Sequence, residues 1–144
     1  MTVTVDEIVR CVHRLAPPEL AESWDNVGLL VGDAGQAVST VLVALDACAE
    51  VLAQAAARGA ELLVTHHPLP FTPQKRLVED AGTGSLLRRL VREGRSVLSA
   101  HTNLDSAPRG VNARVAELLG LRDVRPLVPS DARPLLKLAV FVPA

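Results

Sequence analysis

Two adjacent histidines stand at the end of an apolar run in the middle of this chain. The run ends at Thr65 and leads into His66 and His67, and a second apolar run leads into His101 and, four residues later, Asp105. Imidazole nitrogen and carboxylate oxygen together suit Zn, Mn, Fe, Co or Ni and disfavour Ca, which prefers oxygen ligands alone. The pattern therefore predicts a divalent-metal site with His66, His67 and Asp105 as ligands.

Both apolar runs are typical of buried strands in an α/β sheet, and ligands of open α/β sheets bind just beyond the carboxyl ends of the strands. Apolar runs alternate with helical patterns from Val38 to Leu119, which is typical of βαβ crossovers. We therefore expect an α/β fold whose largely parallel or mixed sheet has helices on both faces.

Local patterns place the elements. A capping box of Thr4 and Glu7 begins a first helix, which Pro17 and Pro18 stop. Later helices are expected at 47–58, 85–93 and 111–119, and strands at 27–31, 38–45, 61–65 and 96–100. The segment from Pro68 to Gly82 is too irregular for a helix or strand.

The neighbouring histidines raise a geometric question, because adjacent residues of a regular strand point to opposite faces. Pro68 makes it difficult for the strand to continue, so each imidazole could hold one ion of a two-metal site, with the ions about 3.5 to 4 Å apart. In the alternative, one ring packs in the core and the other faces solvent. Asp105 could equally be an ordinary carboxylate at a turn or helix start.

The spacing alone does not decide what His101 does. The ring could orient a ligand, act as a general acid or base, or be a hydrogen-bonded core histidine. We take His101 as the candidate catalytic residue, a proton shuttle beside the ions.

Composition excludes several classes of partner. The 144 residues suit one ordinary domain, and 15 Lys and Arg balance 16 Asp and Glu, so no broad field attracts a polyanion or an anionic membrane. Three aromatic residues offer little for bases to stack on, so extended nucleic acid is not expected as a partner. The sequence shows neither a signal core nor a membrane-spanning apolar stretch, and we expect a cytoplasmic protein.

Several single residues are expected to have structural roles. Cys11 and Cys48 are expected as small buried residues without a disulfide, and His13 as a residue of the solvated face of the first helix. Asp46 is expected to favour the start of the following helix, and Trp24 to be a packing anchor or a pocket wall. The glycine-rich run 81–85 lacks the lysine of a phosphate-binding loop and is expected to be a flexible loop.

Four ordered segments resemble the dinuclear-metal-centre family of Nif-three-like proteins, often described as type 2 homologues of GTP cyclohydrolase 1. The resemblance covers nearly the whole chain, and the segments are Pro17–Leu29, Val43–Asp46, Val64–Pro68 and Ser99–Asp105. It implies that His66 and His67 bind separate ions, that Asp105 is a third ligand, that His101 lines the same pocket, and that the protein is a hexamer.

The resemblance also bears on domain organisation. Family members draw a further His and Glu from an HxxxE motif, which these 144 residues lack, and long members carry an inserted domain. The run Leu135–Val142 is typical of a strand that enters a new unit. We therefore expect an N-terminal α/β metal-binding portion over 1–133 and the first strand of a further domain over 134–144, with the chain being part of a longer protein.

The functional hypothesis is a hydrolase with two divalent ions acting on a small molecule, such as a nucleotide or another phosphoester. Three ligands cannot complete two metal sites, so we expect the site to be incomplete within these residues. Ring opening of GTP, as the specific reaction, is implied only by the family resemblance. The alternative is a non-catalytic scaffold or regulatory protein whose ions stabilise its assembly.

Overall fold

A mixed four-stranded sheet forms the centre of the structure, a computed structural model that describes residues 2–79 and 82–126. The strand order is β2-β6-β5-β4, in which β4, β5 and β6 are parallel and β2 is antiparallel to β6. The strands are β2 (Gly28–Val31), β4 (Val41–Ala44), β5 (Leu62–Thr65) and β6 (Ser96–Ser99). The predicted strand at Leu135–Val142, and with it the 134–144 unit, lies outside the described residues.

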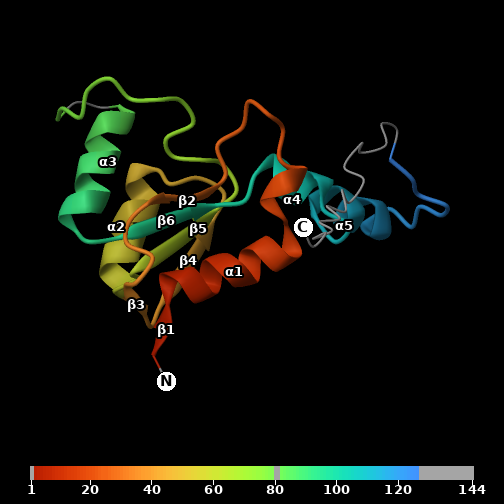
Figure 1. Cartoon of the computed structure of the whole chain (residues 1–144), viewed down its shortest axis with the longest axis horizontal. Coiled ribbons are helices and arrows are strands. Elements are labelled where there is room, and N and C mark those ends of the chain that lie inside the picture. The colour runs from red at the N-terminus through yellow and green to blue at the C-terminus, as the bar shows by residue number, and fades with distance from the viewer. Residues whose placement is uncertain (1, 80–81, 127–144) are drawn as a thin grey trace, which may run out of the picture.

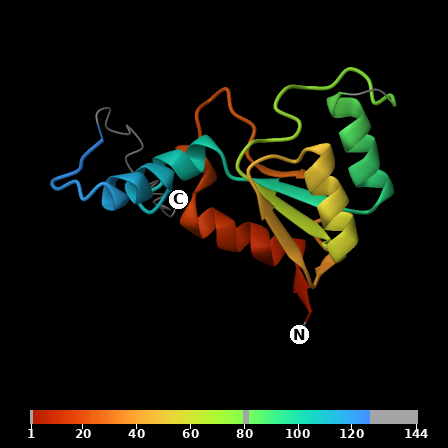
Figure 2. The same ribbon diagram turned by 180° about the vertical axis from the view of Figure 1, so that it is seen from behind.

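Helices cover both faces of this sheet, as the sequence predicts (Figure 1). The helices are α1 (Val5–Leu15), the 3-10 turn η1 (Pro18–Leu20), α2 (Ala49–Arg58), α3 (Thr83–Arg92), α4 (Thr102–Ser106) and α5 (Val111–Leu118). Figure 2 shows α2 and α3 against one face, while α1 crosses the other. The predicted α/β fold with a largely parallel or mixed sheet is therefore confirmed, because three strands are parallel and β2 is antiparallel.

The alternation of side chains along the strands divides the core into two layers. Leu63 of β5 packs with α2 and α3 in one cluster, whereas its neighbour Leu62 packs against Val5 of α1 in the other. Burying one such leucine stabilises the fold by about 1.5 to 3 kcal/mol. The two clusters fix the register of the central strands, and hence the point at which each strand ends.

The predicted strand over 38–45 is wrong as a single element. Ala37–Val38 is β3, which pairs with β1 (Val3–Thr4) in a separate two-stranded sheet, and β4 begins only at Val41. The Glu61 carboxylate causes the break, because it accepts hydrogen bonds from the backbone N–H groups of Ser39 and Thr40 at 3.2 and 2.9 Å. The apolar pattern did not reveal this long-range contact.

Helix α1 begins where the capping box predicts. The Glu7 backbone N–H donates to Thr4 Oγ1 at 3.4 Å, and the Thr4 N–H donates to the Glu7 carboxylate at 2.9 Å. Two expectations for residues of α1 are wrong. Cys11 is exposed rather than buried, and His13 is partly buried rather than solvated, with a buried Nε2 that has no hydrogen-bond partner within the described residues. Cys48 is also only partly buried, and both cysteines are free.

The short helix α4 was not expected and connects β6 to α5. Gly110 permits the turn between the two helices, because a Cβ there would overlap the carbonyl oxygen of Leu104. Across 2–79 and 82–126, the helices are all too short or too polar to cross a bilayer.

Candidate metal centre

Three imidazoles gather at the carboxyl ends of β5 and β6. The ring centroids lie 5.2 Å apart for His66 and His67, 5.1 Å for His66 and His101, and 5.7 Å for His67 and His101. One potential ligand atom of each residue lies within 4.8 Å of the other two. The structure thus brings all three histidines singled out in the sequence to one place, which we call the histidine cluster.

Both members of the adjacent pair belong to this cluster, so the strand pleat does not separate them. The backbone N–H groups of His66 and His67 continue along β4 by donating to the carbonyls of Ala44 and Leu45, at 3.3 and 2.9 Å. Their own carbonyls accept hydrogen bonds from the buried hydroxyls of Ser99 and Thr65, both at 2.9 Å. These contacts fix the backbone at the point where the chain leaves the sheet.

Each ring of the cluster is anchored through its Nδ1. His66 Nδ1 lies 2.9 Å from the Ala100 carbonyl, His67 Nδ1 lies 2.7 Å from Asp46, and His101 Nδ1 lies 2.9 Å from Asp25. A carbonyl or an ionised carboxylate can only accept a hydrogen bond, so each Nδ1 donates. A neutral ring in this state has its lone pair on Nε2, which is the arrangement of metal-binding histidines whose second nitrogen is held by an oxygen acceptor.

The anchor of His101 is the carboxylate of Asp25, whose side chain is fully buried. Burial alone would raise the pKa of Asp25, but hydrogen bonds from the Thr102 hydroxyl, from His101 and from the backbone N–H groups of Asn26 and Thr102 outweigh it. The pKa of Asp25 falls from 3.8 to about 2. Asp25 is therefore ionised at neutral pH and holds the ring of His101 in one orientation.

Asp105 lies beside the cluster, on the side of His66. Its Oδ1 is 3.8 Å from His66 Nε2, and its backbone N–H donates to the His101 carbonyl at 3.1 Å within α4. Zinc–nitrogen and zinc–oxygen bonds are about 2.0 to 2.2 Å long, so two donors that share an ion can be up to about 4 Å apart. The pair of His66 and Asp105 fits that limit.

Two carboxylates at this site were given other roles, or none, in the sequence analysis. Asp46 does not cap α2, because the N-cap is Cys48, which makes no side-chain capping bond, and the Asp46 carboxylate instead contacts His67. Asp25 had no predicted role, although it lies in the first of the four resembling segments. Its position in that segment was the available indication.

Two aromatic side chains adjoin the cluster. Phe71 packs edge-on against His101, with ring centroids 6.2 Å apart, and Trp24 packs edge-on against Phe71 at 6.1 Å. A cavity of about 250 Å³ is lined by His67, Pro68, Phe71 and His101. The candidate centre therefore has an apolar wall on one side and imidazoles on the other.

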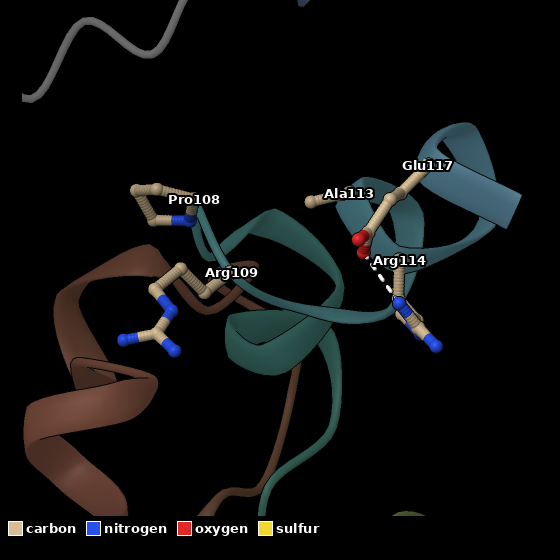
Figure 3. A pocket seen from close by; sticks show the side chains of 5 residues that line it. All are labelled: Pro108, Arg109, Ala113, Arg114 and Glu117. Atoms are coloured by element: carbon tan, nitrogen blue, oxygen red, sulfur yellow. Dashed lines mark hydrogen bonds and ion pairs between the residues drawn. The ribbon is translucent and has the colours of Figure 1, made fainter. Parts of the chain in front are cut away.

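A larger cavity, of about 350 Å³, lies along α5 (Figure 3). Its wall consists of Pro108, Arg109, Ala113, Arg114 and Glu117. Arg114 forms an ion pair with Glu117 at 2.6 Å, and both side chains are largely exposed. Among the described residues, no histidine and no aromatic ring lines this cavity, so it does not belong to the candidate metal centre.

Several known proteins are similar to this chain. A "GTP cyclohydrolase 1 type 2 homolog" of Streptomyces coelicolor is 40% identical over 130 residues, which are 90% of this chain and 46% of that protein. A homolog of the same name from Halalkalibacterium halodurans is 36% identical over 94% of this chain and 37% of that protein. The chain thus spans less than half the length of these relatives.

Solved structures resemble it as well. A Bacillus cereus protein related to NIF3 has a TM-score of 0.84 and 35% identity, covering 90% of this chain and 36% of that one. Reduced HcgD from Methanocaldococcus jannaschii has a TM-score of 0.82 and 33% identity, covering 89% and 51%. Residues 3–140 match the family described as Duf34/NIF3 (NGG1p interacting factor 3). The sequence resemblance is confirmed, and the chain belongs to the Duf34/NIF3 family.

Proposed function

We propose that this chain binds two divalent metal ions through His66, His67 and Asp105 and contributes them to a metal-dependent hydrolase. One observation carries the proposal: each of the three rings in the histidine cluster donates from Nδ1 to an oxygen acceptor. A buried structural histidine needs only to satisfy its nitrogens, whereas in this set no hydrogen bond within the described residues uses Nε2, and the nearest carboxylate to His66 Nε2 is that of Asp105, the third proposed ligand. Zn, Mn, Fe, Co and Ni all suit such a mixture of imidazole and carboxylate ligands.

The reaction would be hydrolysis of a phosphoester, a substrate class that includes nucleotides. When bound, divalent ions lower the pKa of coordinated water toward about 7 and so supply a nucleophile at neutral pH. His101 would accept and return the proton at Nε2, while Asp25 holds the ring through Nδ1. Thr102 fixes the second oxygen of Asp25 and so keeps that carboxylate in place.

The wider biological setting belongs to the same proposal. The relatives named as GTP cyclohydrolase 1 type 2 homologs suggest a nucleotide substrate, but the described residues include no feature that selects guanine. We propose a cytoplasmic homo-oligomer, hexameric as the family resemblance implies. Light scattering on the purified chain tests the stoichiometry.

Metal content and turnover together test the proposal. Wild type and His67→Ala are prepared in the longer protein that the family resemblance implies, loaded with Zn or Mn, dialysed, and compared by elemental analysis and by hydrolysis of a panel of phosphoesters and nucleotides. His13→Gln is the matched control, because it removes the fourth histidine, which lies outside the cluster. We expect His67→Ala to lose at least one ion and all metal-dependent turnover, and His13→Gln to keep both.

Two results would count against the proposal. Equal metal content in wild type and His67→Ala would overturn the metal site itself. Bound metal with no turnover across the panel in the longer protein would overturn the hydrolase and favour the alternative, a non-catalytic scaffold whose ions stabilise its assembly.

A further inference from the structure

Aromatic side chains are scarce in this chain and gather at one point. The sequence has one Trp, two Phe and no Tyr, and the two aromatic residues within the described part are Trp24 and Phe71. They contact each other edge to face, with an interplanar angle of 70°. Neither packs in the two core clusters, and both are exposed, Trp24 to 61% and Phe71 to 47%. We call them the aromatic pair.

The two exposed rings touch each other and so form a contiguous apolar surface, and contiguous exposed apolar patches often mark a binding site. The aromatic pair continues directly into the histidine cluster, because Phe71 lies edge-on to His101 at an interplanar angle of 84°. Phe71 also lines the 250 Å³ cavity with His67 and His101. A group bound in that cavity would therefore touch Phe71 and the imidazoles at the same time.

The loops that bear the two rings are joined to each other and to the cluster. Asn26 Nδ2 donates to the Pro70 carbonyl at 2.7 Å, which links the loop of Trp24 to the loop of Phe71. Asp25, next to Trp24, binds His101. The loop of Trp24 thus orients His101, the candidate proton shuttle, and is also hydrogen-bonded to the loop of Phe71.

The cavity has the size and lining for a flat ring. The cavity is open to solvent on one side, and its volume of about 250 Å³ exceeds the about 150 Å³ of an enclosed apolar cavity that accepts benzene, so one ring fits against Phe71 with its substituent directed outward. Aromatic rings prefer offset or edge-to-face contact with other rings, and such contacts contribute beyond the area they bury. The described residues that line the larger cavity along α5 include no aromatic side chain and offer no such contact.

We propose that Trp24 and Phe71 form a subsite for a planar aromatic group of the substrate, placed so that its ester lies at the histidine cluster. This inference rests on the proposed function, because it names the substrate class of that site as esters bearing an aromatic ring. The aromatic pair selects the substrate by its ring, whereas the imidazoles and Asp105 take part in hydrolysis of its ester.

Ring binding can be measured without metal or turnover. Trp24 is the only Trp and the chain has no Tyr, so intrinsic fluorescence excited at long wavelength reports on the pair. The EDTA-treated chain is titrated with phenyl phosphate and, separately, with cyclohexyl phosphate, which has the same charge and number of ring carbons but a puckered ring. We expect phenyl phosphate to quench Trp24 and to bind about 2- to 10-fold more tightly than cyclohexyl phosphate.

Variants show whether the ring of Phe71 causes the preference. Phe71→Leu keeps an apolar side chain but removes the ring, so the two phosphates should then bind equally, with the far-ultraviolet circular dichroism unchanged. Val91→Ala, on the exposed side of α3, is the matched control and should keep the preference. A Trp24→Leu chain, followed by calorimetry because it lacks the fluorophore, should also lose the preference.

The outcomes separate this inference from the proposed function. Equal binding of the two phosphates to wild type, or a preference that survives Phe71→Leu, would overturn the aromatic subsite whatever the metal data show. A change of oligomeric state in Trp24→Leu by light scattering would overturn it as well, because the pair would then be an interface between copies. Loss of metal in His67→Ala with the preference intact would leave the subsite standing.

Discussion

The two ends of the parallel strands carry polar groups that are satisfied in different ways. At the amino ends of β4, β5 and β6, Glu61 accepts two backbone N–H groups, and Ser96 donates to Gln36 at 2.9 Å. Arg95 there contacts the Glu93 carboxylate and the Ala60 carbonyl. Each of these groups is satisfied by another part of the protein, so this end holds the fold together.

At the carboxyl ends of these strands, the polar side chains are only partly hydrogen-bonded within the described residues. His66, His67 and His101 are each bound through Nδ1, and no hydrogen bond within the described residues uses their Nε2 atoms. We call the amino ends of these strands, whose polar groups are satisfied within the protein, the closed end. We call the carboxyl ends, where the Nε2 atoms make no such hydrogen bond within the described residues, the open end. The difference teaches that a ligand site is marked by well-oriented groups with spare bonding capacity, and not by polarity as such.

The largest expected effect is at the closed end, in Gly32→Ala. Gly32 has φ of +120°, and a Cβ there would overlap the Ser96 side chain and lie 2.7 Å from the Ser96 Cα. Backbone strain and overpacking together should lower the free energy of unfolding by about 3 kcal/mol, measured by urea titration. Metal content per folded chain should not change.

Gly59→Ala is the matched control for that change. Gly59 also has positive φ, +64°, but no atom lies within 4 Å of the added Cβ, so only the strain of the left-handed backbone applies. We expect a loss of about 1 kcal/mol. Equal losses in the two variants would mean that the contact with Ser96 does not hold the closed end.

The next effect is at the open end, in Asp46→Asn. Its contact with His67 Nδ1 at 2.7 Å is solvent-exposed, so the free energy of unfolding should change by less than about 0.5 kcal/mol. If His67 binds metal as proposed, loss of the partner that orients its ring should nevertheless weaken metal binding by about 10- to 100-fold, measured by competition with a chelating dye. Glu79→Gln, which breaks an exposed ion pair with Arg88, should leave metal affinity unchanged. Unchanged metal affinity in Asp46→Asn would show that Asp46 does not orient a metal ligand.

Asp25→Asn shows what the open end contributes to stability. Because the pKa of Asp25 is lowered from 3.8 to about 2, the ionised group contributes about 2 kcal/mol above pH 4, and this contribution is lost as the pH falls through 2. The unfolding free energies of wild type and variant should therefore differ by about 2 kcal/mol at pH 7 and converge near pH 2. Asp6→Asn, in an exposed pair with Arg10, should cost less than about 0.5 kcal/mol at either pH. A gap that stays constant with pH would contradict the ionised anchor.

Local patterns predicted most of the fold. The capping box at Thr4 and the glycine at 59, which ends α2 in the left-handed conformation, involve residues close in sequence, so the chain itself displays them. The same holds for His66 and His67, which the end of β5 places at the edge of the sheet. The convergence with His101 followed from the rule that parallel strands end at one edge.

The rest depends on contacts between distant residues. Asp25 and His101 are 76 positions apart, and Asp46 and His67 are 21 apart, so no spacing rule pairs them. The split of the predicted strand over 38–45 has the same origin in Glu61. The sequence indicated which imidazoles meet, but the carboxylates that orient them required the folded chain.

The smallest effect expected is in Glu61→Gln, at the closed end. The backbone N–H of Thr40 lowers the pKa of Glu61 below its ordinary 4.5, burial opposes this, and the N–H of Ser39 assists. Gln keeps an acceptor oxygen but loses the charge, so the free energy of unfolding should fall by about 1 kcal/mol at pH 7. Since the charged form is the stabilising one, the gap from wild type should shrink as the pH falls below 4.5. Metal affinity should be unchanged, and a loss of metal in Glu61→Gln would show that the two ends of the sheet are coupled.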